Sequence, residues 1–129
     1  MRSMANPVDR QDLLERLGRL RPDTPRLWGK MDAPRMIAHL TDQMRHTLGD
    51  VRATPVSRFR RIPAVRWLAI YVLPWPKGIP GPAEAFVTQP EAWDTDLAEL
   101  CGLVLRFPDH FSRRQFGEHP FFGNLSPEM

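Results

Sequence analysis

The sequence predicts an all-α fold, a helical bundle within a single domain over residues 1–129. Four segments carry apolar residues at the spacing of one helix face, and no stretch alternates apolar and polar residues as a half-buried strand does. The sequence contains no internal repeat that would indicate a second structural unit. With 129 residues, of which 42% are hydrophobic and 26% charged, the chain is long and apolar enough to bury a core of its own.

The first helix is expected to begin after Asn6 and to run to about Leu20. Asn6 can accept a hydrogen bond from the free amide groups of the first turn, and Pro7 suits the first helical position. Asp9 then lies near the positive end of the helix dipole. The helix has one apolar stripe, made of Leu13, Leu14, Leu17 and Leu20.

The second helix is expected to start at Asp32 and to end at Gly49. Asp32 is a good N-cap, Pro34 fits the first turn, and Gly49 suits the left-handed position that ends many helices. Steps of about 100° per residue place six apolar side chains on one face. They are Ala33, Met36, Ile37, Leu40, Met44 and Leu48.

A third, shorter helix is expected over residues 62 to 73, after a connector from 50 to 61 that is rich in arginine. The apolar run IPAVRWLAIYVLPW, residues 62 to 75, is too short to span a membrane and is interrupted by Arg66. We therefore expect a buried helix. The sequence PWPKGIPGPAE that follows contains four prolines and is expected to form an extended, stiff loop.

The fourth helix is indicated by the sequence Thr-Gln-Pro-Glu from Thr88 to Glu91, which has the spacing of a capping box. Its apolar stripe continues until Pro108, where we expect the helix to end. The residues after Pro108 are aromatic and irregular. The stripe consists of Trp93, Leu97, Leu100, Cys101 and Val104.

The charge balance and the cysteine content indicate a mildly basic protein of the cytoplasm. The net charge is only +3, which does not indicate a dedicated nucleic-acid binder, so we expect no nucleic-acid partner. Because the apolar run at 62 to 75 is too short to span a bilayer, we expect no membrane partner either. The single Cys101 cannot form an internal disulfide, and the N-terminal residues lack the apolar region of a secretory signal. Because Cys101 belongs to an apolar stripe, we expect an inert core residue rather than a nucleophile.

Polar side chains with catalytic or ligating potential cluster on the second helix. His39, Asp42, Gln43 and His46 follow one another at i, i+3, i+4 and i+7, so they share one side of the helix beside its apolar stripe. Side chains at such a margin can point into a bundle, where helix-borne metal ligands are found. The two histidines lie about 10 Å apart along the axis, which is too far for one ion. Both could instead be boundary residues hydrogen-bonded to neighbours or water.

Other candidates have simpler explanations. His110 and His119 flank an aromatic region without a second histidine at i+4, so a structural role beside the phenylalanines is expected. The arginines between 58 and 66 could hold phosphate groups, but an exposed connector also accounts for them. The four tryptophans are expected in the core. They are Trp28, Trp67, Trp75 and Trp93.

Three unusual segments carry a family resemblance. They are RLWGKMDAPRMIAHLTDQMRHTLGD at 26 to 50, LPWPKGIPGPAE at 73 to 84 and EHPFFGNLS at 118 to 126. Together they resemble the DinB-like superfamily, in a branch described only as a domain of unknown function. The resemblance covers nearly the whole chain, and the Trp-Pro-Lys-Gly loop and the His-Pro-x-Phe-Gly turn are its most specific parts.

The resemblance implies an up-and-down four-helix bundle with a metal site of three histidines, often nickel or zinc in relatives. His39 matches the ligand position on the second helix. The other two ligands would come from a His-x-x-x-His pair on a last helix after the His-Pro-x-Phe-Gly turn. Ser126 and Pro127 are typical of a helix start, and the sequence given ends at Met129. We therefore expect the bundle to lack that helix and the metal not to be tightly bound.

Some relatives implied by this resemblance are thiol-dependent transferases or isomerases in which the metal activates a small thiol. The first functional expectation is therefore a domain related to metal-dependent enzymes that act on a small-molecule substrate, with an incomplete site. The alternative is a non-catalytic interaction module. In that case an apolar stripe left exposed by the missing helix would form a homodimer or dock a partner.

Overall fold

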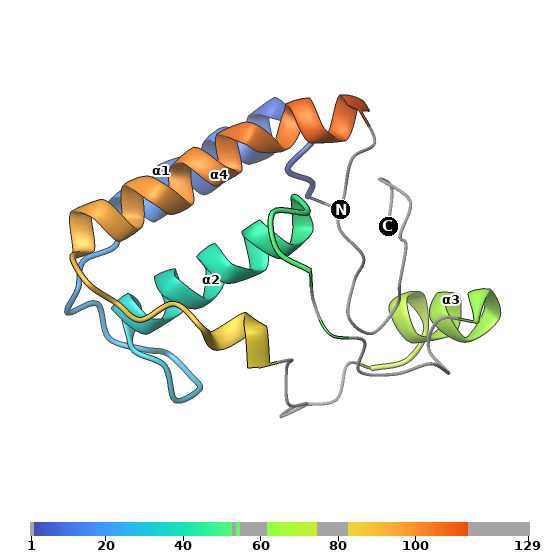
Figure 1. Cartoon of the computed structure of the whole chain (residues 1–129), viewed down its shortest axis with the longest axis horizontal. Coiled ribbons are helices and arrows are strands. Elements are labelled where there is room, and N and C mark those ends of the chain that lie inside the picture. The colour runs from blue at the N-terminus through green and yellow to red at the C-terminus, as the bar shows by residue number, and fades with distance from the viewer. Residues whose placement is uncertain (1, 53, 55–61, 75–82, 114–129) are drawn as a thin grey trace.

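A computed structural model describes residues 2–52, 54, 62–74 and 83–113 of the chain (Figure 1). Within these ranges the structure has four α-helices, one short 3-10 helix and no strand, which confirms the all-α class. The four-helix bundle arrangement of the family stays a prediction. The elements are α1 (Pro7–Arg19), α2 (Ala33–Thr47), α3 (Pro63–Tyr71), the 3-10 helix η2 (Ala83–Phe86) and α4 (Trp93–Arg113).

The start of α1 is fixed by local hydrogen bonding, as predicted. The side-chain oxygen of Asn6 accepts a hydrogen bond from the amide of Val8 at 2.8 Å, and Pro7 occupies the first turn. Leu17 is buried in the core, and the other three leucines of the stripe are partly buried against it. The predicted apolar face of this helix is therefore confirmed.

The boundaries of α2 are also as predicted. Asp32 caps the helix by accepting from the amide of Arg35 at 2.9 Å, and Gly49 has a positive φ of 81° just after the helix end. Ile37 and Met44 on the predicted face are buried. A second side of α2 is buried as well, which the apolar pattern did not predict. It consists of Ala38, Thr41, Asp42 and His46.

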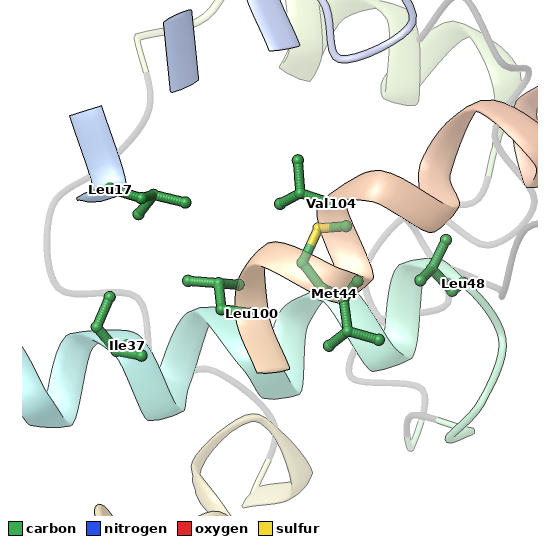
Figure 2. Close-up of a cluster of buried hydrophobic side chains, with 7 residues drawn as sticks. Leu17, Ile37, Met44, Leu48, Leu100 and Val104 are labelled. Carbon is green, nitrogen blue, oxygen red and sulfur yellow. The ribbon is translucent and has the colours of Figure 1, made fainter. Parts of the chain in front are cut away.

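The hydrophobic core lies where α4 packs against both α1 and α2. Figure 1 shows α1 and α4 side by side, with α2 next to them. Leu100 and Val104 of α4 face Ile37 and Met44 of α2, as Figure 2 shows. Burial of these side chains from three helices supplies most of the apolar stabilisation visible in the described part of the chain. The buried cluster is Leu17, Ile37, Met44, Leu48, Leu100, Leu103 and Val104.

Both predicted boundaries of the fourth helix are wrong. The helix begins at Trp93 rather than at the Thr88 capping box. Glu91 precedes the helix, and its amide donates a hydrogen bond of 3.0 Å to the side chain of Asp96 in the first turn. It also continues through Pro108 to Arg113. A proline inside a helix removes one backbone hydrogen bond, and the helix on either side of it can persist. In the part of the helix after the proline, the hydroxyl of Ser112 donates a hydrogen bond of 2.9 Å to the carbonyl oxygen of Pro108.

The prediction that the third helix is buried is wrong for its described side chains. Val65, Trp67, Leu68 and Tyr71 are between 39% and 55% exposed, and α3 packs against none of the other described helices. In Figure 1 it stands apart from α1, α2 and α4. The helical spacing of apolar residues therefore predicted α3 correctly, but its high apolar content did not predict whether its side chains are buried.

Of the three tryptophans in the described ranges, Trp93 alone has the expected core position, since it packs against the core cluster. Trp28 is 88% exposed and Trp67 is 55% exposed. Trp75 and His119 lie outside the described residues, as do the loop at 75–82 and the expected helix start at Ser126. No helix in the described ranges combines the length and the apolar composition needed to cross a bilayer.

One exposed ion pair joins the end of α2 to α4. Arg106 donates two hydrogen bonds to the Asp50 carboxylate, at 2.9 and 3.1 Å. The side-chain hydrogen bond from Arg106 lowers the pKa of Asp50 below its ordinary value of 3.8, although burial opposes this. Because the pKa is lower in the folded state, the ion pair contributes stability above pH 3.8 that is lost as the pH falls through the folded-state pKa.

We therefore expect Asp50→Asn to be slightly less stable than the parent protein near neutral pH. The difference should shrink to zero in acid, once Asp50 is protonated in the folded parent protein. Urea unfolding at a series of pH values measures this, with NMR titration of the Asp50 carboxyl as a direct check. A stability difference that stays constant down to the lowest pH would contradict the assignment of the effect to this ion pair.

Candidate functional site

The candidate site lies where α2 meets residues 83 to 91, a stretch we call the 83–91 segment. It contains η2 and the extended residues that follow it, and η2 packs against α2. The side of α2 that faces it carries His39, Asp42 and Arg45, which are spaced about one turn apart. All three side chains contact residues of this segment, which is more than 40 positions away in sequence.

His39 is held in one orientation by two neighbours on the 83–91 segment. Its Nδ1 lies 2.7 Å from the carbonyl oxygen of the buried Ala85. Its ring stacks on Phe86, with centroids 4.6 Å apart and an angle of 12° between the planes. A carbonyl oxygen can only accept a hydrogen bond, so Nδ1 carries the proton and donates it.

This contact determines which nitrogen of the neutral His39 ring has a lone pair. With Nδ1 protonated, the lone pair is on Nε2, which has no hydrogen-bond partner among the described residues. The ring is half-buried. A half-buried, oriented imidazole with an available Nε2 can act as a metal ligand or as a general base.

Asp42 has a structural role beside His39. Its side chain is buried at 5% exposure, and it accepts hydrogen bonds from the amide of Thr88 at 2.9 Å and from the Thr88 hydroxyl at 2.5 Å. Arg45 lies 3.6 Å from the same carboxylate and donates to the Thr88 hydroxyl at 3.1 Å. A buried charge requires such partners, and both oxygens of this carboxylate have one.

One further contact holds the 83–91 segment against α2, and another joins α2 to α4. Arg45 also forms an ion pair with Glu99 of α4, and Arg35 donates to the side-chain oxygen of Gln89. The segment is therefore bound to α2 near Thr88 and again at Gln89. Since Ala85 and Phe86 belong to the same segment, these contacts indirectly position the His39 ring.

The other two histidines in the described ranges and the cysteine do not join this site. His46 is buried at 6% exposure and its Nδ1 lies 3.2 Å from the carbonyl of Val51, which agrees with the expected boundary role. His110 contacts the carbonyl of Arg106 within its own helix at 3.2 Å. Cys101 is partly buried against the core cluster, as its place on the apolar stripe predicts, and burial raises the pKa of its thiol. Its inert role stays a prediction.

The sequence indicated His39 and Asp42 but not their partners. Ala85, Phe86 and Thr88 were missed because helix periodicity contains no information about a segment so far along the chain. One signal was present, since an aspartate at the margin of a buried face requires a donor from another element. The capping-box pattern predicts a helix cap for Thr88, and that role would leave its hydroxyl unavailable to Asp42.

Within residues 2–52, 54, 62–74 and 83–113, no group of three or more histidine, cysteine or acidic side chains is arranged to hold a metal ion. The His-x-x-x-His helix of the resemblance has no counterpart in these ranges. His39 therefore stays a predicted ligand. Comparison with family models, with curated proteins and with solved structures finds no match to this chain.

Proposed function

We propose that this chain is a DinB-like helical domain in which His39 is one ligand of a divalent metal ion, nickel or zinc. By the resemblance, this domain would be related to thiol-dependent transferases or isomerases that act on a small molecule, and it would not bind the metal tightly. The observation that carries the proposal is the orientation of His39, whose Nδ1 donates to the Ala85 carbonyl and leaves Nε2 available. The three-segment resemblance supports the same position as a ligand and the bundle arrangement around it.

The chemistry of His39 fits a metal ligand. Metal-binding histidines usually donate their second ring nitrogen to a carboxylate or a backbone carbonyl, which fixes the tautomer and increases the basicity of the ligating nitrogen. The Ala85 carbonyl is such an acceptor, and Phe86 covers one face of the ring. A catalytic zinc site commonly uses three protein ligands, so His39 would act with others.

When bound, the ion would supply Lewis acidity and lower the pKa of a coordinated thiol. The residues of this chain have separate tasks. His39 presents Nε2, Ala85 holds the proton on Nδ1, and Phe86 shields the ring from water. Asp42 and Thr88 keep the 83–91 segment against α2, so they act as positioning residues rather than catalytic ones.

We expect NMR of the metal-free protein to show His39 with the proton on Nδ1. Long-range proton–nitrogen spectra of the histidine rings distinguish the two tautomers directly. On titration with Zn²⁺ or Ni²⁺, the Nε2 signal of His39 should change at lower metal concentration than the signals of the other histidines. The reason is that its lone pair is available and its ring is already oriented, so binding loses less conformational entropy.

The variant His39→Ala should lose this response. His110→Ala removes a histidine from the surface of α4 and serves as the matched control for adventitious metal binding, so it should leave the response intact. A proton on Nε2 of His39, or a metal affinity that His39→Ala leaves unchanged, would overturn the proposal. Circular dichroism of both variants checks that the helices remain folded.

A further inference from the structure

The chain around α3 carries a concentrated positive charge. Between Asp50 and Glu84 there is no acidic residue, whereas the same stretch contains six basic ones. The remaining chain has twelve basic and fifteen acidic residues, a net charge of −3. The net charge of +3 for the whole chain is therefore unevenly distributed in the sequence, and residues 51–83, which include α3, form a basic region. The six are Arg52, Arg58, Arg60, Arg61, Arg66 and Lys77.

The described side chains of α3 form an exposed apolar surface. Val65 and Leu68 lie at i and i+3 on one side of the helix, and Val72 follows at i+7 as the residue that ends it. Trp67 and Tyr71 lie at i and i+4 on the adjoining side, with ring centroids 6.1 Å apart. All five are exposed, and α3 packs against none of the other described elements. We call these five side chains the α3 surface.

We propose that the α3 surface docks on an anionic phospholipid membrane. The aliphatic side chains would enter the boundary between headgroups and acyl chains, with α3 lying in the plane of the interface. Trp67 and Tyr71 have the amphipathic rings that are enriched at headgroup depth. The basic region of the chain would be attracted to the negative lipid surface.

Two other partners fit these observations less well. A nucleic acid would use the positive charge and the aromatic rings, but the aliphatic Val65, Leu68 and Val72 would gain nothing from phosphate or bases. A symmetric dimer through α3 would bring two basic regions together, and their repulsion opposes it. We expected no membrane partner because the apolar run is too short to span a bilayer, but a peripheral contact does not need that length.

Vesicle co-sedimentation of the whole chain tests the proposal. The parent protein should sediment with vesicles that contain phosphatidylserine, and about tenfold less with pure phosphatidylcholine or in high salt. Leu68→Glu places a negative charge in the α3 surface and should weaken binding about tenfold or more. Leu105→Glu makes the same change at an exposed leucine of α4 and should bind like the parent protein.

Several results would overturn this assignment. They are absence of binding to the anionic vesicles, binding that Leu68→Glu leaves unchanged, and equal losses in the two glutamate variants. Sedimentation velocity without lipid tests for a second copy of the chain. If the parent protein does not bind vesicles but self-associates, and Leu68→Glu abolishes the self-association, the α3 surface is a dimer interface. Retention on an RNA or DNA probe, without vesicle binding, would assign the region to nucleic acid instead.

Discussion

Replacing Leu100 with alanine is expected to lower the free energy of unfolding by about 3 kcal/mol. Leu100 is only 2% exposed and lies at the centre of the packing between α4 and α2, as Figure 2 shows. The shorter side chain would leave a cavity beside Ile37 and Met44, because close-packed neighbours relax only partly. For a domain with a net stability of about 5–15 kcal/mol, this is a large fraction of the total.

Urea unfolding followed by far-ultraviolet circular dichroism measures this loss. Leu105→Ala is the matched control, since it makes the same change on the same helix at a side chain that is 59% exposed. It should alter the free energy of unfolding by no more than about 0.5 kcal/mol. Similar losses in the two variants would show that α4 does not present Leu100 to α2 as described.

The boundaries of α1 and α2 could be predicted because the interactions that fix them are local. Asn6 caps an amide two residues away and Asp32 caps one three residues away, so the sequence pattern contains both partners. Gly49 ends α2 through a backbone conformation that few other residues adopt. Such signals do not depend on the rest of the fold, and all three were confirmed.

The start of α4 could not be predicted in the same way, because a distant partner competes for the capping residue. The Thr88 hydroxyl, which a capping box would direct to the helix, instead donates to Asp42 of α2. The extension beyond Pro108 has a different cause, since one lost hydrogen bond is small beside the packing of a helix with 21 residues.

The candidate site was half predictable for a related reason. His39 was identified from its place at the margin of the α2 stripe, which is a property of one helix. The acceptor for its Nδ1 and the ring that stacks on it come from the 83–91 segment, and their position depends on tertiary contacts. For α3, apolar composition predicted burial, but burial requires a partner surface that composition does not reveal.

Replacing Asp42 with alanine is expected to lower the free energy of unfolding by about 3 kcal/mol. The change leaves the amide of Thr88 without its acceptor and removes the carboxylate beside Arg45. Asp42→Asn keeps one carbonyl oxygen that can accept from Thr88, so its loss should be about half as large. Asp109→Ala removes an exposed aspartate from α4 and should have little effect.

The same variants test whether Asp42 positions the site through the 83–91 segment. If it does, Asp42→Ala should speed hydrogen exchange at the Thr88 amide and weaken the preference of His39 for a proton on Nδ1, because the Ala85 carbonyl would no longer be held beside the ring. Asp42→Asn should show both effects more weakly and Asp109→Ala neither. A destabilised Asp42→Ala protein with unchanged Thr88 exchange and an unchanged His39 tautomer would show that Asp42 stabilises α2 without positioning His39.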